Sequence, residues 1–554
     1  MSTQQTGFSR RGFLGLAGLA VTTVGLSACG GGGGAASGEG GAAASSAVKL
    51  PTYKEFTGVT PDIPGNAKGL QAAFFKMPAN PVQSVKSAPL KGGTVTGLTE
   101  TFDTMSPGLK DNAFWQRLNG KLGGTLELQI AEDIGDGYPA KFATVLASND
   151  LPDLMWVPPN QGIPNVGPML EAKFQDLTEY LSGDAVLEYP NLAALKPDSW
   201  KTAVVNGKIW GAPIPSTPFG QVWIGNADMW APVGGFNANN AEEFLEKAKE
   251  ITRPGESKYA LEPAYINALH MVTEWFGAPN GWAVNKDRTL THLFETEQYK
   301  AGVEFVAKMF AAGVFYPDTQ APDIRNRVAN GTVGAQVNAG PAGVKQYRSV
   351  NATGKFEILV PFSADGKIKP VYDMGYGTVG FTPFKKTDEG KIRELLSLID
   401  YLSAPFGTVE YMQKNFGELG QDYTLDGSGN PVLTESGRVN VPGLTSALNI
   451  MSSPENVVFN PGFDDDTRYI NEQMQKLLEI SWRNPTNGTY SDTNSRSGSK
   501  LTKIVRDKAV DIITGRAQVG DLDAAVKRWR DEGGEKIREE YQAALDPEAP
   551  VFSS

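Results

Sequence analysis

Hydrophobic positions recur with two different periods once the chain passes residue 92. Leu126, Leu128 and Ile130 alternate with other residues, a period of two that predicts a strand over residues 125–131. In residues 107–122 large apolar side chains recur every four positions, which predicts a helix. The same patterns predict strands over residues 94–98 and 153–157 and a helix over 139–148. This alternation of strands and helices implies a parallel sheet, with ligands bound beyond the carboxyl ends of its strands.

A second series of elements begins near residue 226. Asn240 and Glu243 form a capping box ahead of a predicted helix over 241–251, and Gly313 ends one over 297–312. The pattern predicts further strands over 333–337, 356–360 and 377–381, a helix over 393–403, a hairpin over 423–433, and mostly helical structure over 465–545. No repeat of 20–50 residues is visible, which argues against a solenoid.

Composition narrows the function classes. The 554 residues are 40% hydrophobic and 20% charged, which is typical of a globular protein with a large core. One cysteine excludes an intramolecular disulfide, and only two histidines argue against a multi-histidine zinc site. We interpret His270 as a satisfied core or interface histidine on a helix and His292 as exposed. The net charge of −11 argues against a nucleic-acid partner.

The single cysteine stands at the end of a segment that resembles an export signal. Arg10 and Arg11 precede an apolar run over residues 14–26, and Leu-Ser-Ala leads directly to Cys29. The order resembles a twin-arginine signal followed by a bacterial lipobox. It predicts a signal peptide over residues 1–28, a lipid on Cys29, and a location at the outer face of the cell membrane. The alternative is a chance apolar N-terminus with an unused buried cysteine.

Residues 30–46 are glycine, alanine and serine with one glutamate, so they predict a flexible tether, which we place over residues 29–48. No other segment approaches 18 consecutive apolar residues, and we therefore expect no second membrane span.

Several motifs together resemble one protein family. Residues 147–154 read ASNDLPDL, residues 206–213 read NGKIWGAP, and residues 313–318 read GVFYPD. With IGNADM at 224–229 and Phe244 in a following helix, these segments resemble extracellular solute-binding proteins of sugar ABC importers. They occur in family order across residues 90–430, and the nearest subgroup is the large lipoproteins for oligosaccharides or uronate-containing sugars. Neither residues 252–261 nor residues 426–437 fit the calcium loop that some of this subgroup carry.

The resemblance implies an α/β, two-lobed, periplasmic-binding-protein-like fold. Each lobe is expected to hold a mixed, mostly parallel sheet flanked by helices, and hinge strands are expected to cross between the lobes. The implied boundaries are residues 49–222 and 375–445 for the first lobe, 226–372 for the second lobe, and 446–548 for a C-terminal helical segment that packs on both. No cofactor or metal is implied, and the acidic run 464–466 is interpreted as a solvated helix N-terminus.

A sugar presents apolar CH faces, which aromatic rings cover, and hydroxyl edges, which amides and carboxylates satisfy once water leaves. Side chains of these types lie at predicted strand ends of this chain, on the segments expected to cross between the lobes, and in segments that reach the cleft in the resembled family. The candidate ligand-binding residues are Trp156, Asn160, Phe219, Gln221, Trp223, Glu262, Tyr265, Trp275, Trp282, Asn338 and Tyr376. Core packing is the alternative for each tryptophan, and we favour it for Trp210, Trp230, Trp482 and Trp529.

The resemblance implies a monomeric, non-catalytic receptor that closes around a carbohydrate and delivers it to an ABC permease. A lipid-anchored glycoside hydrolase is the alternative, and it would need a pair of carboxylates about 5 Å or 7–9 Å apart. A third class, an adhesin or structural lipoprotein, would lack a cleft between lobes.

Overall fold

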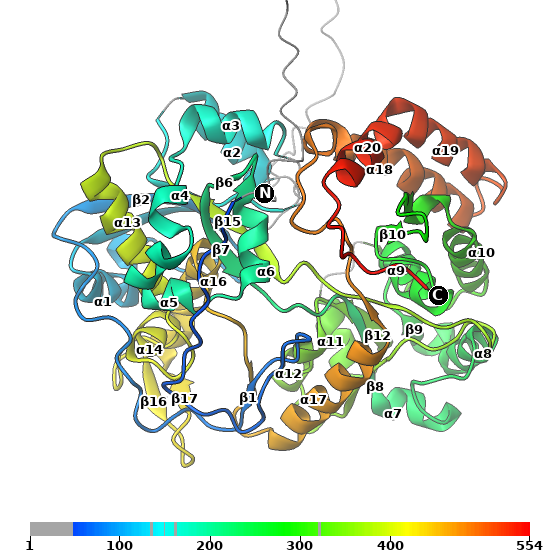
Figure 1. Cartoon of the computed structure of the whole chain (residues 1–554). Helices are drawn as coiled ribbons and strands as arrows, with labels where there is room; N and C mark the ends of the chain where they lie inside the picture. Colours follow the sequence, from blue (N-terminus) through cyan, green and yellow to red (C-terminus); the bar gives the residue numbers. More distant parts are fainter. Residues whose placement is uncertain (1–47, 133–136, 149, 160–162, 320–322, 554) are drawn as a thin grey trace, which may run out of the picture. The chain divides into compact units, whose positions relative to one another are not determined.

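A computed structural model describes residues 48–132, 137–148, 150–159, 163–319 and 323–553 of the chain (Figure 1). The predicted signal peptide with Arg10, Arg11 and Cys29, almost all of the predicted tether, and Asn160 lie outside the described residues. Within the described ranges, no helix combines the length and apolar character needed to cross a membrane.

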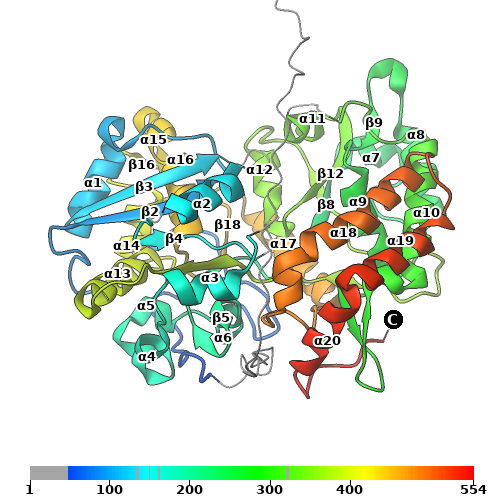
Figure 2. The same cartoon turned by 90° about the horizontal axis from the view of Figure 1, so that it is seen from above.

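The three-stranded sheet of the first lobe is fully parallel, as the sequence predicts. Strand β2 (Thr94–Thr101) lies between β3 (Thr125–Glu132) and β4 (Leu154–Met155), and Figure 2 shows the three strands side by side. Helix α1 (Ala113–Leu122) begins later than predicted, because Asn112 accepts a hydrogen bond from the Trp115 amide and caps it. Helix α2 (Gly137–Ser148) matches its predicted segment.

The chain returns to the first lobe after visiting the second. Strand β15 (Thr378–Pro383) pairs antiparallel with β7 (Gly211–Pro215), and helices α13 (Glu389–Leu402) and α16 (Pro442–Met451) pack into the same core as β2 and α1. The predicted hairpin is present as β16 (Tyr423–Leu425) and β17 (Pro431–Leu433).

The second lobe holds a mixed sheet in the order β13-β8-β12-β9. Strand β8 (Val222–Asn226) runs antiparallel to both neighbours, β13 (Phe356–Ile358) and β12 (Val333–Asn338). Only β12 and β9 (Tyr259–Leu261) are parallel. The expected mostly parallel pairing therefore holds in the three-stranded sheet of the first lobe but not in the sheet of the second lobe. There β8 comes directly from the first lobe and runs antiparallel to both of its neighbours.

Helices cover this second sheet. Helix α8 (Ala241–Ile251) has the predicted bounds, and its cap is Asn240, whose side chain accepts from the Glu243 amide. Helices α9 (Tyr265–Trp275) and α10 (Glu297–Ala311) join it in the main core of this lobe.

The C-terminal segment is helical, as predicted, and completes the second lobe. Helix α17 (Asp464–Glu479) packs with β8 in a separate core. Helices α18 (Asp492–Ile513), α19 (Asp521–Trp529) and α20 (Glu535–Ala543) join the main core, where α18 contacts α10 (Figure 2).

Three segments connect the two lobes: residues 216–221, residues 374–377 and residues 452–463. The first segment meets Asp373, which directly precedes the second segment, at Gly220: a Cβ atom there would lie 2.0 Å from the carbonyl oxygen of Asp373. Only glycine permits this approach. The Tyr372 hydroxyl closes the same junction by donating to the Gly220 carbonyl at 2.8 Å. In the third segment β18 (Val458–Phe459) pairs with β1 (Ala73–Phe74) near the N-terminus.

Candidate ligand-binding site

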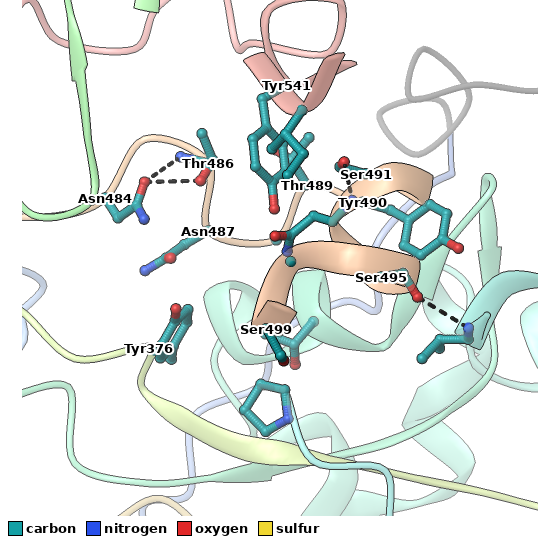
Figure 3. Close-up of a pocket in the computed structure, with 18 of the residues that line it drawn as sticks. Tyr376, Asn484, Thr486, Asn487, Thr489, Tyr490, Ser491, Ser495, Ser499 and Tyr541 are labelled. Carbon is teal, nitrogen blue, oxygen red and sulfur yellow. Dashed lines mark hydrogen bonds between the residues drawn. The ribbon is translucent and has the colours of Figure 1, made fainter. Parts of the chain in front are cut away.

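The candidate site is a cavity of about 1,040 Å³ to which three parts of the chain contribute (Figure 3). The first lobe supplies residues 157–159, 201–202, 204–205 and 380–381, the second lobe supplies Gly281, Trp282 and His292, and the C-terminal segment supplies residues between 484 and 541. Because both lobes line the cavity, a molecule inside it would contact each of them.

One wall of the cavity consists of uncharged polar side chains. They come from the loop that precedes α18 and from the first turns of that helix: Asn484, Thr486, Asn487, Thr489, Tyr490, Ser491, Asn494, Ser495 and Ser499. Ser491 fixes the start of α18, because its hydroxyl oxygen accepts from the Asn494 amide at 3.0 Å. Asn484 fixes the loop by accepting from the amide and the hydroxyl of Thr486. The wall thus offers amide and hydroxyl groups on a braced backbone.

Aromatic rings form another part of the lining. Tyr376 is 45% exposed, and in Figure 3 its side chain, Asn487 and Tyr541 point toward a common space. Trp282 is only 4% exposed, because His292, Tyr541 and Trp529 surround its ring. Tyr376 is therefore the accessible ring of the two, while the Trp282 ring is almost fully covered.

His292 belongs to this aromatic cluster, so the expectation that it is exposed is wrong. Its ring centroid lies 4.7 Å from that of Trp282 and 4.6 Å from that of Trp529. Its Nδ1 accepts a hydrogen bond from the Phe294 amide. Burial lowers the pKa of His292 to about 3, so the ring is neutral at physiological pH.

Four charged side chains also belong to the described lining of the cavity: Lys201, Lys503, Arg506 and Asp507. Lys503 pairs with Asp507 at 2.8 Å on the same helix, and Lys201 pairs with Asp198 at 2.9 Å. Arg506 lines the cavity and has no ion pair with any of the described residues. Asp507 is the single carboxylate of the described lining. Positive charge therefore exceeds negative charge in the lining.

Known proteins share this architecture. No family model matches the chain. It is 23% identical over 437 residues to the polygalacturonan/rhamnogalacturonan-binding protein YtcQ of Bacillus subtilis strain 168, covering 73% of this chain and 82% of that protein. The structure of the present chain is similar to that of an HMO-binding, ABC-transporter-associated solute-binding protein of Bifidobacterium longum infantis, with a TM-score of 0.60 and 14% identity. The match covers 81% of this chain and 98% of that protein. The N-glycan transport solute-binding protein of Streptococcus pneumoniae is also similar, with a TM-score of 0.57 at 18% identity over 82% and 98%.

The fold is that of a two-lobed solute-binding protein. The resemblance indicated by the ordered sequence motifs is thereby confirmed.

Two of the predicted ligand residues, Trp282 and Tyr376, line the cavity. Trp156 does not. It is 1% exposed, packs against Tyr138 with ring centroids 4.8 Å apart, and donates from Nε1 to the Val379 carbonyl at 2.8 Å. The residue after it, Val157, does line the cavity. The predicted strand end therefore reaches the site, while the indole itself turns into the core.

The other predicted aromatic residues are mostly core residues. Phe219, Trp223 and Trp275 are each 1% exposed and lie in the two cores of the second lobe. Trp223 stacks on Phe244 with ring centroids 5.6 Å apart. Tyr265 packs edge-on against Phe310, at 5.6 Å between centroids. None of these four rings is part of the cavity lining.

The predicted polar residues also lie elsewhere. Glu262 is 6% exposed, and its Oε1 accepts from the Val337 amide at 2.8 Å. Asn338 donates to Gln346, and Gln221 is half-buried on a segment that connects the lobes. None of the three predicted residues lines the cavity.

Sequence reasoning missed the polar wall. Residues 484–491 read NPTNGTYS, an amide- and hydroxyl-rich break between two helices. The prediction of mostly helical structure over residues 465–545 passes over this break. Of the four tryptophans assigned to the core, Trp210, Trp230 and Trp529 are buried, whereas Trp482 is half-buried and donates to the Trp282 carbonyl at 3.3 Å.

Proposed function

We propose that this chain is the carbohydrate receptor of an ABC importer, which binds an oligosaccharide between its lobes and delivers it to a membrane permease. The observation that supports this most directly is the composition of the cavity. It combines the exposed ring of Tyr376 with a wall of amides and hydroxyls, and both lobes contribute to it.

This lining matches the chemistry of a sugar. A tyrosine ring covers a CH face without consuming hydroxyl groups, and side chains such as Asn487 and Ser495 can each donate and accept hydrogen bonds. A volume of about 1,040 Å³ is at the upper end for small-molecule sites, which favours several sugar units over one.

The charges of the lining extend the proposal to the ligand class. Arg506 has no carboxylate partner among the described residues, and Lys201 and Lys503 stand at the same cavity. The relative YtcQ is named for binding polygalacturonan and rhamnogalacturonan. An acidic oligosaccharide is therefore the first ligand class to test, and neutral oligosaccharides form the comparison set.

The hydrolase alternative has less support. A glycoside hydrolase needs two carboxylates that flank the bond to be cleaved. The described lining of the cavity contains one, Asp507, and it is already paired with Lys503. The relatives are themselves binding proteins.

Ligand binding can be measured by thermal shift and calorimetry with oligogalacturonides and neutral oligosaccharides. Tyr376→Ala is expected to weaken binding of the selected sugar at least tenfold. Tyr53→Ala is the matched control, because Tyr53 is 41% exposed and lies outside the cavity lining. Equal affinity in wild type and Tyr376→Ala, or release of shorter sugars during incubation, would contradict the proposal.

We also propose that the lobes reorient about their connecting segments and that the monomeric, ligand-bound form docks on the permease. The proposed boundaries are those expected from the sequence: 49–222 and 375–445, then 226–372, then 446–548. The strand order supports them, because β7 and β15 pair in one lobe while β8 belongs to the other.

The N-terminal motif supports a membrane-anchored location. Arg10 and Arg11 would direct export by the twin-arginine route, and Cys29 would carry the lipid. In a bacterial host, Cys29→Ala is expected to move the protein from the membrane fraction to the soluble fraction. Unchanged membrane association of that variant would refute the anchor.

A further inference from the structure

Three side chains of metal-ligand type converge away from the sugar cavity. His270 and Glu274 are four residues apart on helix α9, so they project from the same face. Asp373 reaches them from β14 (Tyr372–Asp373), a short strand that precedes the second connecting segment. One ligand atom from each residue lies within 4.8 Å of the other two.

The two carboxylates are buried without a compensating cation. Glu274 is 2% exposed and Asp373 is 6% exposed. No lysine or arginine in the described part of the chain forms an ion pair with either, and the nearest basic group is His270 Nδ1, 3.7 Å from Asp373 Oδ2. Two buried carboxylates side by side repel each other, so this arrangement needs either protons or a bound cation.

One oxygen of the cluster lacks a partner altogether. Glu274 Oε1 accepts from the Asp373 amide at 2.9 Å. Asp373 Oδ1 is buried and has no hydrogen-bond partner among the described residues. Buried polar atoms are rarely left unsatisfied, and an ion that the structure lacks is one established reason for such an atom.

His270 adds an imidazole nitrogen to the two carboxylates and leaves the cluster open to solvent on its own side. About a third of the His270 side chain is exposed, which leaves an access route and space for a water ligand.

We infer that His270, Glu274 and Asp373 bind one divalent cation of the zinc class. One imidazole nitrogen with two carboxylate oxygens, and an open position for water, is a ligand set that zinc accepts. Calcium takes six to eight oxygens, and the cluster offers too few.

The position of the site indicates a structural role. The cation would link α9 to Asp373, whose carbonyl oxygen is the atom that Gly220 approaches in the other connecting segment. It would therefore brace the point where two connecting segments leave the second lobe.

The site can be tested on the full chain after treatment with a chelator and dialysis. Zinc ions are titrated in competition with a chromophoric chelator, and cobalt ions are added separately to detect visible absorption from a bound ion. We expect one equivalent of zinc, a visible cobalt spectrum and a higher midpoint of thermal unfolding with zinc.

Two variants and one matched control decide the assignment. His270→Gln and Asp373→Asn are each expected to weaken zinc binding at least tenfold. Asp465→Asn, which removes an exposed carboxylate from the acidic run, should bind as wild type does. If Asp373→Asn does not fold, His270→Gln still tests the zinc site, because the His270 side chain is partly exposed and its replacement disturbs the packing less.

Three outcomes would overturn the inference. The first is no saturable zinc binding by the wild type, which would leave protons as the charge compensation. The second is wild-type affinity in His270→Gln. The third is calcium binding that exceeds zinc binding and does not depend on His270.

Discussion

Replacing Glu262 by glutamine is expected to remove part of the pH dependence of this protein's stability. Glu262 is buried beside the second sheet, and burial raises the pKa of its carboxyl from 4.5 to about 7, although the hydrogen bond from the Val337 amide opposes the shift. Glutamine keeps an oxygen that can accept from Val337 and carries no charge to bury.

The sign follows from proton binding. Between pH 4.5 and 7 the folded chain holds the Glu262 proton while the unfolded chain releases it, so the free energy of unfolding falls as pH rises. A rise from 4.5 to about 7, at about 1.4 kcal/mol per unit, corresponds to about 3 kcal/mol. That contribution is complete below pH 4.5 and is lost above pH 7.

The assay is urea unfolding of the wild type and Glu262→Gln at pH 5, 6, 7 and 8. Other buried acids contribute equally to both proteins, so their contributions cancel when the two free energies of unfolding are subtracted at each pH. Asp400, whose pKa burial raises to about 7, is one of these acids. The variant should gain stability relative to wild type as pH rises, by about 3 kcal/mol across the full range. Tyr347 lies near Glu262, but burial raises its pKa further above the assay range. Parallel pH profiles for the two proteins would refute the reasoning.

The remaining predictions concern packing and ion pairs. Trp156→Ala should lower the free energy of unfolding by about 3–5 kcal/mol in urea, and a loss below 1 kcal/mol would contradict its core position. Gly220→Ala should lower the free energy of unfolding by about 1–3 kcal/mol, since the added Cβ atom would collide with the Asp373 carbonyl oxygen. Unchanged stability would show that the backbone can shift to make room for it. Arg348→Met should lower the free energy of unfolding by about 1–3 kcal/mol at neutral pH, because the half-buried Asp466 carboxylate loses its partner; loss of the effect in high salt would argue for a surface pair.

Local signals were sufficient for many helices and strands. The bounds of α8 were predictable because its cap, Asn240, and its apolar stripe lie within one short segment. The start of α1 was not, because the helix begins at the Asn112 cap rather than at the first favourable residue after Pro107. The antiparallel pairing of β8 depends on its arrival from the other lobe, which no local pattern records.

The site was harder to predict, because it depends on contacts between distant residues. A tryptophan at a strand end can face the cavity or the core, and the indole of Trp156 turns inward to bond Val379, 223 positions away. The burial of His292 depends on Trp529, which comes from a C-terminal helix. The cluster of Glu274 and Asp373 joins residues 99 positions apart, so their proximity was not apparent from sequence spacing.

The position of the last helices has a consequence for synthesis of the chain. Met451 is the last residue along the chain that belongs to the main core of the first lobe, whereas the main core of the second lobe includes residues up to Ala549. Roughly one hundred residues separate the two, which a ribosome adds in about 5–20 s. During that interval the apolar surface around Trp282, which Trp529 and Tyr541 later cover, is exposed to solvent and to other chains. The two lobes therefore differ in their exposure to aggregation and proteolysis, and a ribosome that stops after α17 would release a finished first lobe joined to an unfinished second one.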